Sequence, residues 1–372
     1  MGCCSKIKIG VLIDSGNMGG IQKIAIEEVK NLNRLGFCAN LLVMDMKLQS
    51  GEPTQNVEFL FNSKFPKIKV PPFDFLTLNH MFTYVNPIKL KKITKYNVII
   101  AHNILSAIPP IISSKIFNKH IKKVLYFHDT AYTIINLYTK SKSIQQIVRK
   151  IENKVINSYD LIVANSDITA NIIKEIYGVD PFILYPGVSY ISGKPPQRKL
   201  YDIVFVTRWN SRRNLELVLE IAKSFPKFKI VMAGIWSNTR DKNEFLIKLI
   251  EENVRNIKII DKFLNERDLL GLYYWSKMYV QTEPVAFGMG ALEALANWCI
   301  PIVWKESGVS RLFLKEGMGR FIVSSKKDIL KKVNEILTEY PIKGMAQLVR
   351  NIRKKYNWAT HVRKLVKIIY SI

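Results

Sequence analysis

Residues 7–13 are Ile7-Lys8-Ile9-Gly10-Val11-Leu12-Ile13, and this run decides the first half of the fold. Its side chains are almost all apolar, which is typical of a strand that is buried on both faces of a parallel sheet. The pair Gly19-Gly20 follows, and then a segment keeps its apolar residues at helical spacing until Gly36. A strand, a glycine loop and a helix in this order predict the first unit of a doubly wound sheet.

The same alternation of apolar runs and helical patterns continues along the chain in two series. The first series of predicted strands comprises residues 39–43, 97–100, 123–127 and 161–164. The second series comprises residues 202–206, 229–233, 257–260, 278–280 and 300–303. We therefore predict an α/β fold with two Rossmann-like domains, each built on a doubly wound parallel sheet, that face each other across a cleft.

The domain boundary is predicted from a segment rich in proline and glycine, Ser192–Pro196, which separates the two series. We expect a first domain over residues 1–187, a linker over residues 188–200 and a second domain over residues 201–350. The last residues, 351–372, are basic and amphipathic, which predicts a terminal helix. This layout alone names no function, because many α/β enzymes share it.

The chain of 372 residues carries a formal net charge of +26, which points to an anionic partner. Nucleic acid, an acidic membrane surface and phosphorylated substrates all fit that charge. The basic residues are spread over both halves and form no arginine-rich tail, which argues against a nucleic-acid partner. Because no apolar run approaches the roughly 20 residues of a membrane span and no signal peptide is apparent, we expect a cytoplasmic protein.

The stretch from Glu283 to Ala296 is the strongest candidate site. It follows a predicted strand and leads through Phe287-Gly288-Met289-Gly290 into a helix, so free backbone N–H groups and the helix dipole suit a diphosphate. Glycines at 288 and 290 allow close approach of a ligand, and Glu293 is placed to bond two ribose hydroxyls. The alternative is an ordinary helix start in which the acid favours the dipole.

Arg208 and Arg213 form a second candidate cluster, in the turn that directly follows the first strand of the second domain. The forked guanidinium group suits phosphate oxygens, and two such groups across one turn are placed to grip a diphosphate. These cations would also stabilise the negative charge that a leaving diphosphate gains in the transition state. The alternative is a solvated basic turn in a very basic protein.

In the first domain, His128 is the best candidate, because it stands with Asp129 at the end of a predicted strand. A histidine there is placed to bond a sugar or to move a proton, although a structural histidine is equally common. His102, at the end of the preceding strand, is a weaker candidate. Gly19 and Gly20 give only a weak phosphate-loop signal, since the full GxGxxG pattern is absent.

No metal site is predicted. The chain has no Asp-x-Asp, and no cluster of His, Cys and carboxylate residues has the spacing of metal ligands. Cationic side chains and helix termini would then do the work of a divalent ion, and no cofactor is expected.

Over nearly its whole length the chain resembles the retaining GT-B glycosyltransferases of family 4. Gly19-Gly20 with the following helix is similar to the family's first loop and helix, and Ala164-Asn165-Ser166 to the segment that closes its first domain. Arg208 and Arg213 stand at the Arg and Lys positions of the donor-phosphate motif. Trp358 matches the aromatic position of a helix that crosses back to the first domain, which the resemblance implies for residues 351–372.

Phe287-Gly288 and Glu293-Ala294 match the second half of the family's paired-glutamate signature, but the first half departs from it. Val285 stands where the family has a glutamate that contacts the donor sugar, and the nearest acid is Glu283. A loop shifted by two residues would let Glu283 substitute, and we favour this hypothesis. Otherwise the sugar contact, and with it the activity, is in doubt.

The resemblance implies metal-independent transfer of a sugar from a UDP- or GDP-sugar to a glycan, a lipid-linked or a protein-linked acceptor, with retention of configuration. We assign His128, Arg208, Arg213 and Glu283 as catalytic residues, and we expect the donor to contact Gly19, Gly20, Phe287, Gly288, Met289, Gly290 and Glu293. The alternatives are a catalytically impaired protein that binds nucleotide sugars, a nucleotide-sugar epimerase and an inverting GT-B enzyme.

A segment of the first domain combines aromatic residues with lysines, among them Phe73, Phe75, His80, Met81, Phe82, Tyr84, Lys89, Lys91 and Lys92. A basic, aromatic surface suits peripheral contact with anionic lipid at the cytoplasmic membrane face, which fits a lipid-linked acceptor. The alternative is a partly buried loop.

Overall fold

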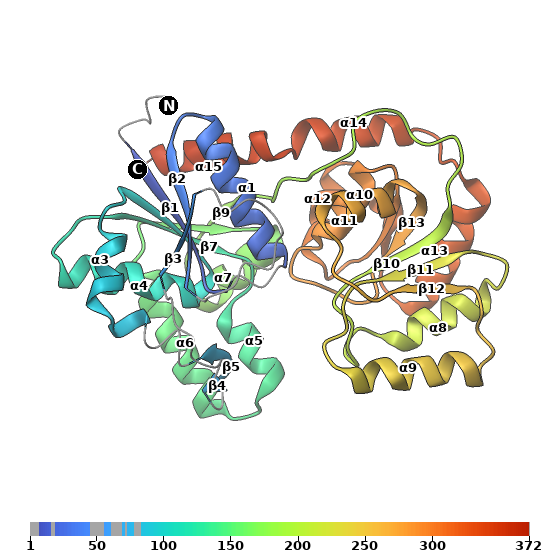
Figure 1. Cartoon of the computed structure of the whole chain (residues 1–372), viewed down its shortest axis with the longest axis horizontal. Helices are drawn as coiled ribbons and strands as arrows, with labels where there is room; N and C mark the ends of the chain where they lie inside the picture. Colours follow the sequence, from blue (N-terminus) through green and yellow to red (C-terminus); the bar gives the residue numbers. More distant parts are fainter. Residues whose placement is uncertain are drawn as a thin grey trace. The chain divides into compact units, whose positions relative to one another are not determined.

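The computed structural model describes residues 7–15, 19–44, 56–60, 69–70, 73–77 and 83–371. The chain forms two compact units (Figure 1). The first unit comprises Met1–Gly187 together with Trp358–Ile372, and the second comprises Val188–Asn357. The second unit thus includes the proline- and glycine-rich segment that precedes its first strand.

The first unit contains a seven-stranded parallel sheet in the order β3-β2-β1-β6-β7-β8-β9. Its strands are β1 (Lys8–Ile13), β2 (Cys38–Val43), β3 (Val57–Phe59), β6 (Val98–His102), β7 (Lys122–Phe127), β8 (Leu161–Ala164) and β9 (Phe182–Ile183). The strand order reverses between β1 and β6, so the carboxyl ends of these strands flank a topological switch point, where α/β proteins bind ligands. A separate antiparallel pair consists of β4 (Lys69–Val70) and β5 (Phe73–Thr77).

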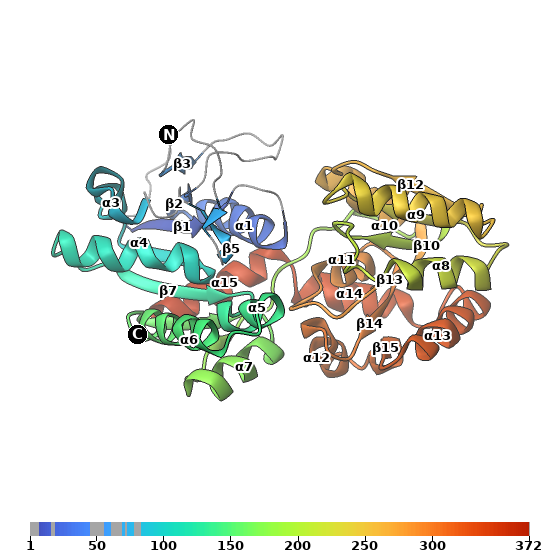
Figure 2. The same ribbon diagram turned by 90° about the horizontal axis from the view of Figure 1, so that it is seen from below.

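Helices cover this sheet as the alternating pattern predicts. They are α1 (Gly20–Arg34), α3 (Pro87–Ile93), α4 (Asn103–Ile116), α5 (Ala131–Tyr138), α6 (Lys142–Ile156), α7 (Asp167–Tyr177) and α15 (Trp358–Tyr370). Helix α15 packs against α1, and α4 packs against α3 and α6 (Figure 2). The C-terminal segment is therefore part of the first unit's own helical layer.

The second unit contains a six-stranded sheet in the order β12-β11-β10-β13-β14-β15, also parallel throughout. Its strands are β10 (Tyr201–Val206), β11 (Ile230–Ala233), β12 (Ile257–Ile260), β13 (Ser276–Val280), β14 (Ile300–Trp304) and β15 (Ile322–Val323). The strand order again reverses, here between β10 and β13, which gives this unit a switch point of its own.

The helices of the second unit are α8 (Leu215–Ser224), α9 (Thr239–Glu251), α10 (Glu266–Tyr274), α11 (Met289–Ala296), α12 (Gly308–Lys315), α13 (Lys326–Glu339) and α14 (Met345–Lys355), with a 3-10 turn at Gly319–Phe321. Figure 1 shows α8 and α9 on one face of the sheet and α10 and α11 on the other. Helix α14 packs on α11.

Burial of the central strands explains why both sheets form. Leu12, Ile99 and Leu125 in the first unit and Val204 and Met278 in the second are wholly inaccessible to solvent. Each such side chain contributes about 1.5–3 kcal/mol through removal of apolar surface from water. The predicted α/β fold with two doubly wound parallel sheets is thus confirmed. Among the described residues, no helix is long and apolar enough to span a bilayer.

Candidate functional site

Two loops of the second unit meet at the carboxyl edge of its sheet. One loop follows β10 and the other follows β13, and these strands are parallel neighbours, so both loops leave the sheet at the same edge. Together they line a small cavity, with Thr207, Trp209 and Arg213 from the first loop and Thr282 and Glu283 from the second. The fold therefore joins two of the clusters that the sequence predicts.

An ion pair between the Arg213 guanidinium and the Glu283 carboxylate connects the two loops. The side chains are 31% and 21% exposed, so both remain accessible from solvent. The Nε of Arg213 also donates to the backbone oxygen of Arg208 at 3.3 Å, and Asn214 Nδ2 donates to the Thr282 oxygen at 3.1 Å. Of the two predicted arginines, Arg213 thus lines the cavity, whereas Arg208 is exposed and does not line it.

The loop after β13 is held by a small polar network. The Val285 N–H donates to Ser307 Oγ at 3.1 Å, and the Ser307 hydroxyl donates to Gln281 Oε1 at 2.7 Å. The same oxygen accepts the Trp304 N–H at 3.1 Å. Val285 is thus held through its backbone N–H, and its side chain is apolar. Glu283 is therefore the carboxylate that this loop supplies to the cavity.

Helix α11 begins at the end of this loop. Gly288 precedes it with φ of +100°, in the left-handed region that favours glycine, and no side chain caps the helix start. The first residues, Met289 and Gly290, therefore leave the helix start open to an anion. A Cβ at Gly290 would lie 3.0 Å from the Tyr273 hydroxyl, so this glycine also makes room for a packed tyrosine.

Glu293 and Phe287, at either side of the helix start, are both largely buried, with 3% and 5% of their surface exposed. Burial and then the nearby Glu293 charge raise the pKa of the Tyr279 phenol. The backbone oxygen of Phe287 accepts the Val309 N–H at 2.7 Å, which ties the loop to α12. Phe287 is therefore a buried packing residue of the loop, and Glu293 is a buried acid close to Tyr279.

In the first unit, His128 directly follows β7, and His102 ends the neighbouring strand β6. The two rings are stacked, and His102 Nδ1 lies 2.8 Å from His128 Nε2. On its other side, His102 Nε2 lies 3.0 Å from Glu28 Oε2, on helix α1. Burial first, and then the proximity of His102, holds the pKa of His128 well below its usual range. His128 is thus a neutral imidazole at the carboxyl edge of the sheet.

The next residue, Asp129, is partly buried beside this histidine. Burial raises the pKa of its carboxyl group to about 6, although a hydrogen bond from the Thr130 N–H works in the opposite direction. A carboxyl group with that pKa exchanges protons near neutrality, which is what general acid–base chemistry requires.

Gly19 and Gly20 lie at the start of α1, which has no side-chain cap and no acidic residue in its first turn. Gln22 Nε2 donates to the Ser15 oxygen at 3.0 Å, which ties the helix to the end of β1. The residues between Ser15 and Gly19 lie outside the described part of the chain.

The segment that combines aromatic residues with lysines is described only in part. His80, Met81, Phe82 and the side chains of Phe73 and Phe75 lie outside the described residues. The Tyr84 hydroxyl donates to the Leu105 oxygen at 3.0 Å.

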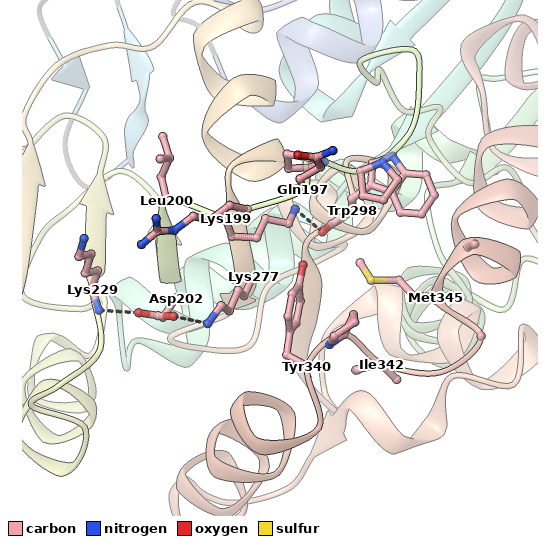
Figure 3. A pocket seen from close by; sticks show the side chains of 16 residues that line it. Gln197, Lys199, Leu200, Asp202, Lys229, Lys277, Trp298, Tyr340, Ile342 and Met345 are labelled. Atoms are coloured by element: carbon pink, nitrogen blue, oxygen red, sulfur yellow. Dashed lines mark hydrogen bonds and ion pairs between the residues drawn. The ribbon is translucent and has the colours of Figure 1, made fainter.

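A larger cavity, of about 820 Å³, lies at the opposite edge of the second unit's sheet (Figure 3). Lys199 donates to the backbone oxygens of Tyr274 at 2.6 Å and Trp298 at 2.8 Å, and burial lowers its pKa to about 8. Lys277 is paired with Asp202 at 2.7 Å. None of the sequence-predicted site residues lines this cavity, which lies where the strands begin rather than where they end. Its size alone therefore does not mark it as the active site.

Sequence reasoning missed the chemical role of three residues in these sites, namely Glu28, His361 and Gln281. Glu28 lies 74 residues from His102 and 333 residues from His361, so no local spacing connects them. Gln281, the first residue after β13, fixes the following loop through Trp304 and Ser307. One signal in the sequence could have indicated Glu28. It stands next to Glu27 on the apolar face of an amphipathic helix, and a carboxylate that is buried there needs polar partners.

The family described as Glycosyltransferase Family 4 matches residues 18–190, and that described as Glycosyl transferases group 1 matches residues 191–355. No curated protein sequence matches the chain.

Solved structures are similar over almost the whole chain at low sequence identity. Sucrose-phosphate synthase from Thermosynechococcus elongatus has a TM-score of 0.77 at 13% identity, covering 98% of this chain and 99% of that one. A glycosyltransferase from Rickettsia africae has a TM-score of 0.73 at 18% identity, covering 98% of each chain. HepE from Anabaena, solved in complex with UDP and glucose, has a TM-score of 0.72 at 13% identity, covering 98% of this chain and 100% of that one. At these identities the similarity shows a shared fold.

Proposed function

Because the chain belongs to the GT-B glycosyltransferases of family 4 and group 1, we propose that it transfers a sugar from a nucleotide diphosphate sugar to an acceptor hydroxyl. The donor is a UDP- or GDP-sugar, and the configuration at the anomeric carbon is retained. The observation that carries this proposal is that Arg213 and Glu283 meet in one cavity of the second unit, which is lined by the loop that leads on to the uncapped start of α11.

The donor's diphosphate would lie against Arg213 and the N–H groups at the start of α11. A guanidinium group and a helix N-terminus both stabilise phosphate charge, and this charge grows as the nucleoside diphosphate leaves. Arg208 is exposed beside Arg213 and would supply a second cation to the same phosphates. Gly288, Met289 and Gly290 allow the backbone to approach the ligand.

Glu293 and Glu283 would contact the two ends of the donor. Glu293 is the acid proposed to accept hydrogen bonds from the ribose hydroxyls. Glu283 takes the place of the absent acid at Val285 and would contact the transferred sugar. Its partner in the structure is Arg213, so sugar binding would have to draw the carboxylate away or share it.

We propose that His128, together with Gly19 and Gly20 of the same unit, contacts the sugar that is transferred. As a neutral imidazole it can accept or donate a hydrogen bond to a sugar hydroxyl. We propose that the reaction needs no divalent metal, because the chain lacks Asp-x-Asp and places guanidinium groups where a cation is required. Chelator-treated protein should therefore keep its full rate.

We also propose a cytoplasmic protein that makes peripheral contact with anionic membrane and takes a glycan or a lipid-linked acceptor. Ile88, on α3, is 73% exposed, and Lys91 is exposed on the same helix, while Val85, which precedes the helix, is 74% exposed. Exposed aliphatic residues beside lysines suit the surface of an anionic bilayer. The variant Ile88→Ser/Lys91→Glu should bind anionic vesicles more weakly than wild type and bind neutral vesicles no differently.

The reaction is tested by incubating the protein with radiolabelled UDP- and GDP-sugars, with and without a membrane extract. We expect release of nucleoside diphosphate together with labelled product, and NMR of the product should show the anomeric configuration of the donor. Binding without release would instead identify a nucleotide-sugar-binding protein. An isomerised donor would identify an epimerase, and a product of opposite configuration an inverting enzyme.

Glu293→Gln tests the donor site itself. We expect its affinity for the free nucleoside diphosphate to fall about tenfold or more, because charged hydrogen bonds contribute about 1.5–3 kcal/mol. The matched control is Glu339→Gln, an exposed acid on α13 whose partner is Arg320. Equal affinity of both variants would remove Glu293 from the donor site.

A further inference from the structure

Four buried side chains of the first unit form a continuous hydrogen-bonded chain. Glu28 on α1 is wholly buried and lies between two histidines, with Oε2 at 3.0 Å from His102 Nε2 and Oε1 at 2.9 Å from His361 Nε2. His102 Nδ1 in turn lies 2.8 Å from His128 Nε2. The chain therefore runs from helix α15 through α1 and β6 to the end of β7.

The protons on this chain can be counted from its two fixed ends. His361 Nδ1 lies 2.8 Å from the backbone oxygen of Tyr185, which only accepts, so this nitrogen carries a proton. Although burial opposes ionisation, the neighbouring His102 and His361 lower the pKa of Glu28 to about 2, so both of its oxygens accept. His361 is then protonated on both nitrogens, and His102 is protonated on Nε2.

One carboxylate compensates one buried imidazolium. A second imidazolium at His102 would leave an uncompensated charge in the protein interior, at a cost of several kcal/mol. His102 is therefore neutral, with a lone pair on Nδ1, and the contact to His128 is an N–H donated by His128 Nε2. The Tyr126 hydroxyl, beside both rings, donates to the Leu184 oxygen at 2.5 Å and takes no part.

The remaining nitrogen of His128, Nδ1, follows from this count. A neutral imidazole that donates through Nε2 has a lone pair on Nδ1, and that nitrogen makes no hydrogen bond to the described residues. The backbone fixes the ring's position as well, since the His128 N–H donates to Asn103 Oδ1 at 2.7 Å and Asn165 Nδ2 donates to its oxygen at 3.2 Å.

We infer that Glu28 is a positioning residue that acts through His102 to hold His128 in the tautomer whose Nδ1 accepts a hydrogen bond from a sugar hydroxyl. This inference rests on the proposed function for its ligand class, but its structural half can be tested without any substrate. It assigns a direction to the hydrogen bonds among these four side chains, each of which is donated toward Glu28.

Glu28→Gln would keep that direction. Glutamine carries no charge to compensate an imidazolium, so His361 would be neutral, keep its Nδ1 proton for Tyr185 and accept the glutamine NH2 group at Nε2, while the glutamine oxygen accepts from His102 Nε2. Glu28→Leu reverses the direction instead, because a buried N–H at His102 Nε2 would have no acceptor. His102 would donate from Nδ1 to His128 Nε2, and the proton of His128 would move to Nδ1. The acceptor offered to the sugar thus becomes a donor, with little change in shape.

The tautomers are measured by two-bond ¹H–¹⁵N correlation NMR on protein with labelled histidines. We expect His128 to be protonated on Nε2 in wild type and in Glu28→Gln and on Nδ1 in Glu28→Leu, with Glu27→Leu as the matched control on the same helix. Glu27 pairs with Lys30 at 3.0 Å and takes no part in the hydrogen bonds between Glu28 and the histidines, so its variant should match wild type. A wild-type His128 protonated on Nδ1 would overturn the inference even if no variant folds.

Activity provides the second readout. We expect Glu28→Leu to lower the transfer rate about tenfold to a hundredfold, and to have no further effect when His128 is already replaced by alanine. Glu28→Gln should keep the wild-type rate, because it preserves the tautomer. Additive losses in the two backgrounds would show a structural role only and overturn the positioning role. If wild type transfers no sugar while the tautomer reverses as expected, the proposed function fails and the hydrogen-bonded chain stands.

Discussion

Arg213 and Glu283 lie 70 residues apart in the chain and form an ion pair at the carboxyl edge of the second unit's sheet. The arginine comes from the loop after β10 and the glutamate from the loop after β13. The pairing neutralises the cation that we propose for the donor's phosphates. It also presents the one carboxylate of the second loop to the same cavity.

Glu283→Gln separates the two roles of this acid. Loss of the charge frees Arg213, so affinity for the free nucleoside diphosphate should stay equal or rise. Transfer should fall by about a hundredfold if the carboxylate contacts the sugar, because such an interaction is strongest in the transition state. Calorimetry with UDP or GDP and a product assay check the two halves. Transfer at the wild-type rate would disprove the shifted-loop hypothesis.

Arg213→Met should weaken binding of the nucleoside diphosphate about tenfold to a hundredfold, since hydrogen bonds to charged groups contribute about 1.5–3 kcal/mol. Arg212→Met is the matched control in the same turn, because Arg212 is exposed and does not line the cavity. Calorimetric titration of both variants measures the difference. If the two lose the same affinity, general attraction by a basic protein explains binding and a specific phosphate contact does not.

Gly288→Ala should destabilise the second unit by about 1–3 kcal/mol, because φ of +100° is strained for a residue with a Cβ. The new Cβ would also lie 3.1 Å from both Gln281 Nε2 and Val309 Cγ1. Gly317→Ala is the control, since it has φ of +72° with nothing within 4 Å of the added Cβ. Urea unfolding should show a larger loss for Gly288→Ala, and donor affinity should fall only in that variant.

Asp129 makes the first unit less stable as the pH rises. Its pKa of about 6 lies above the ordinary aspartate value of 3.8, so the folded protein binds this proton more tightly than the unfolded chain does. The stabilisation is therefore complete below pH 3.8 and is lost as the pH rises through 6, by up to about 3 kcal/mol.

Asp129→Asn removes this titration. At pH 8 the variant should be more stable than wild type, and near pH 4 the two should unfold at similar urea concentrations. A difference in unfolding free energy that stays constant from pH 4 to pH 8 would show that Asp129 does not titrate in this range. Because the group is only partly buried, water screening would reduce the size of the effect but not its sign.

Most of the fold is predictable from local pattern. The run Ile7–Ile13 and the helix that follows it appear in the structure as β1 and α1, and Gly36, with φ of +88°, stands where the helical spacing ends. The predicted strand at residues 161–164 coincides with β8. These elements depend on side-chain alternation and on turn residues, which neighbouring positions in the chain already contain.

The candidate sites are predictable only in part. Loops that follow parallel strands converge on one edge, so Arg213 and the segment before α11 could be assigned to one region from sequence. The ion pair between Arg213 and Glu283 could not be predicted, because it depends on which strands become neighbours in the sheet. The different exposures of Arg208 and Arg213 likewise depend on the path of a turn.

The sequence by itself determined two doubly wound sheets, the family and the residues at the strand ends, because periodicity and short motifs are local properties. Only the tertiary structure decided that Glu28 meets His102 and His361, and hence which nitrogen of His128 is left to a ligand. The physical reason is that a buried carboxylate needs partners from several elements, and packing rather than spacing along the chain supplies them.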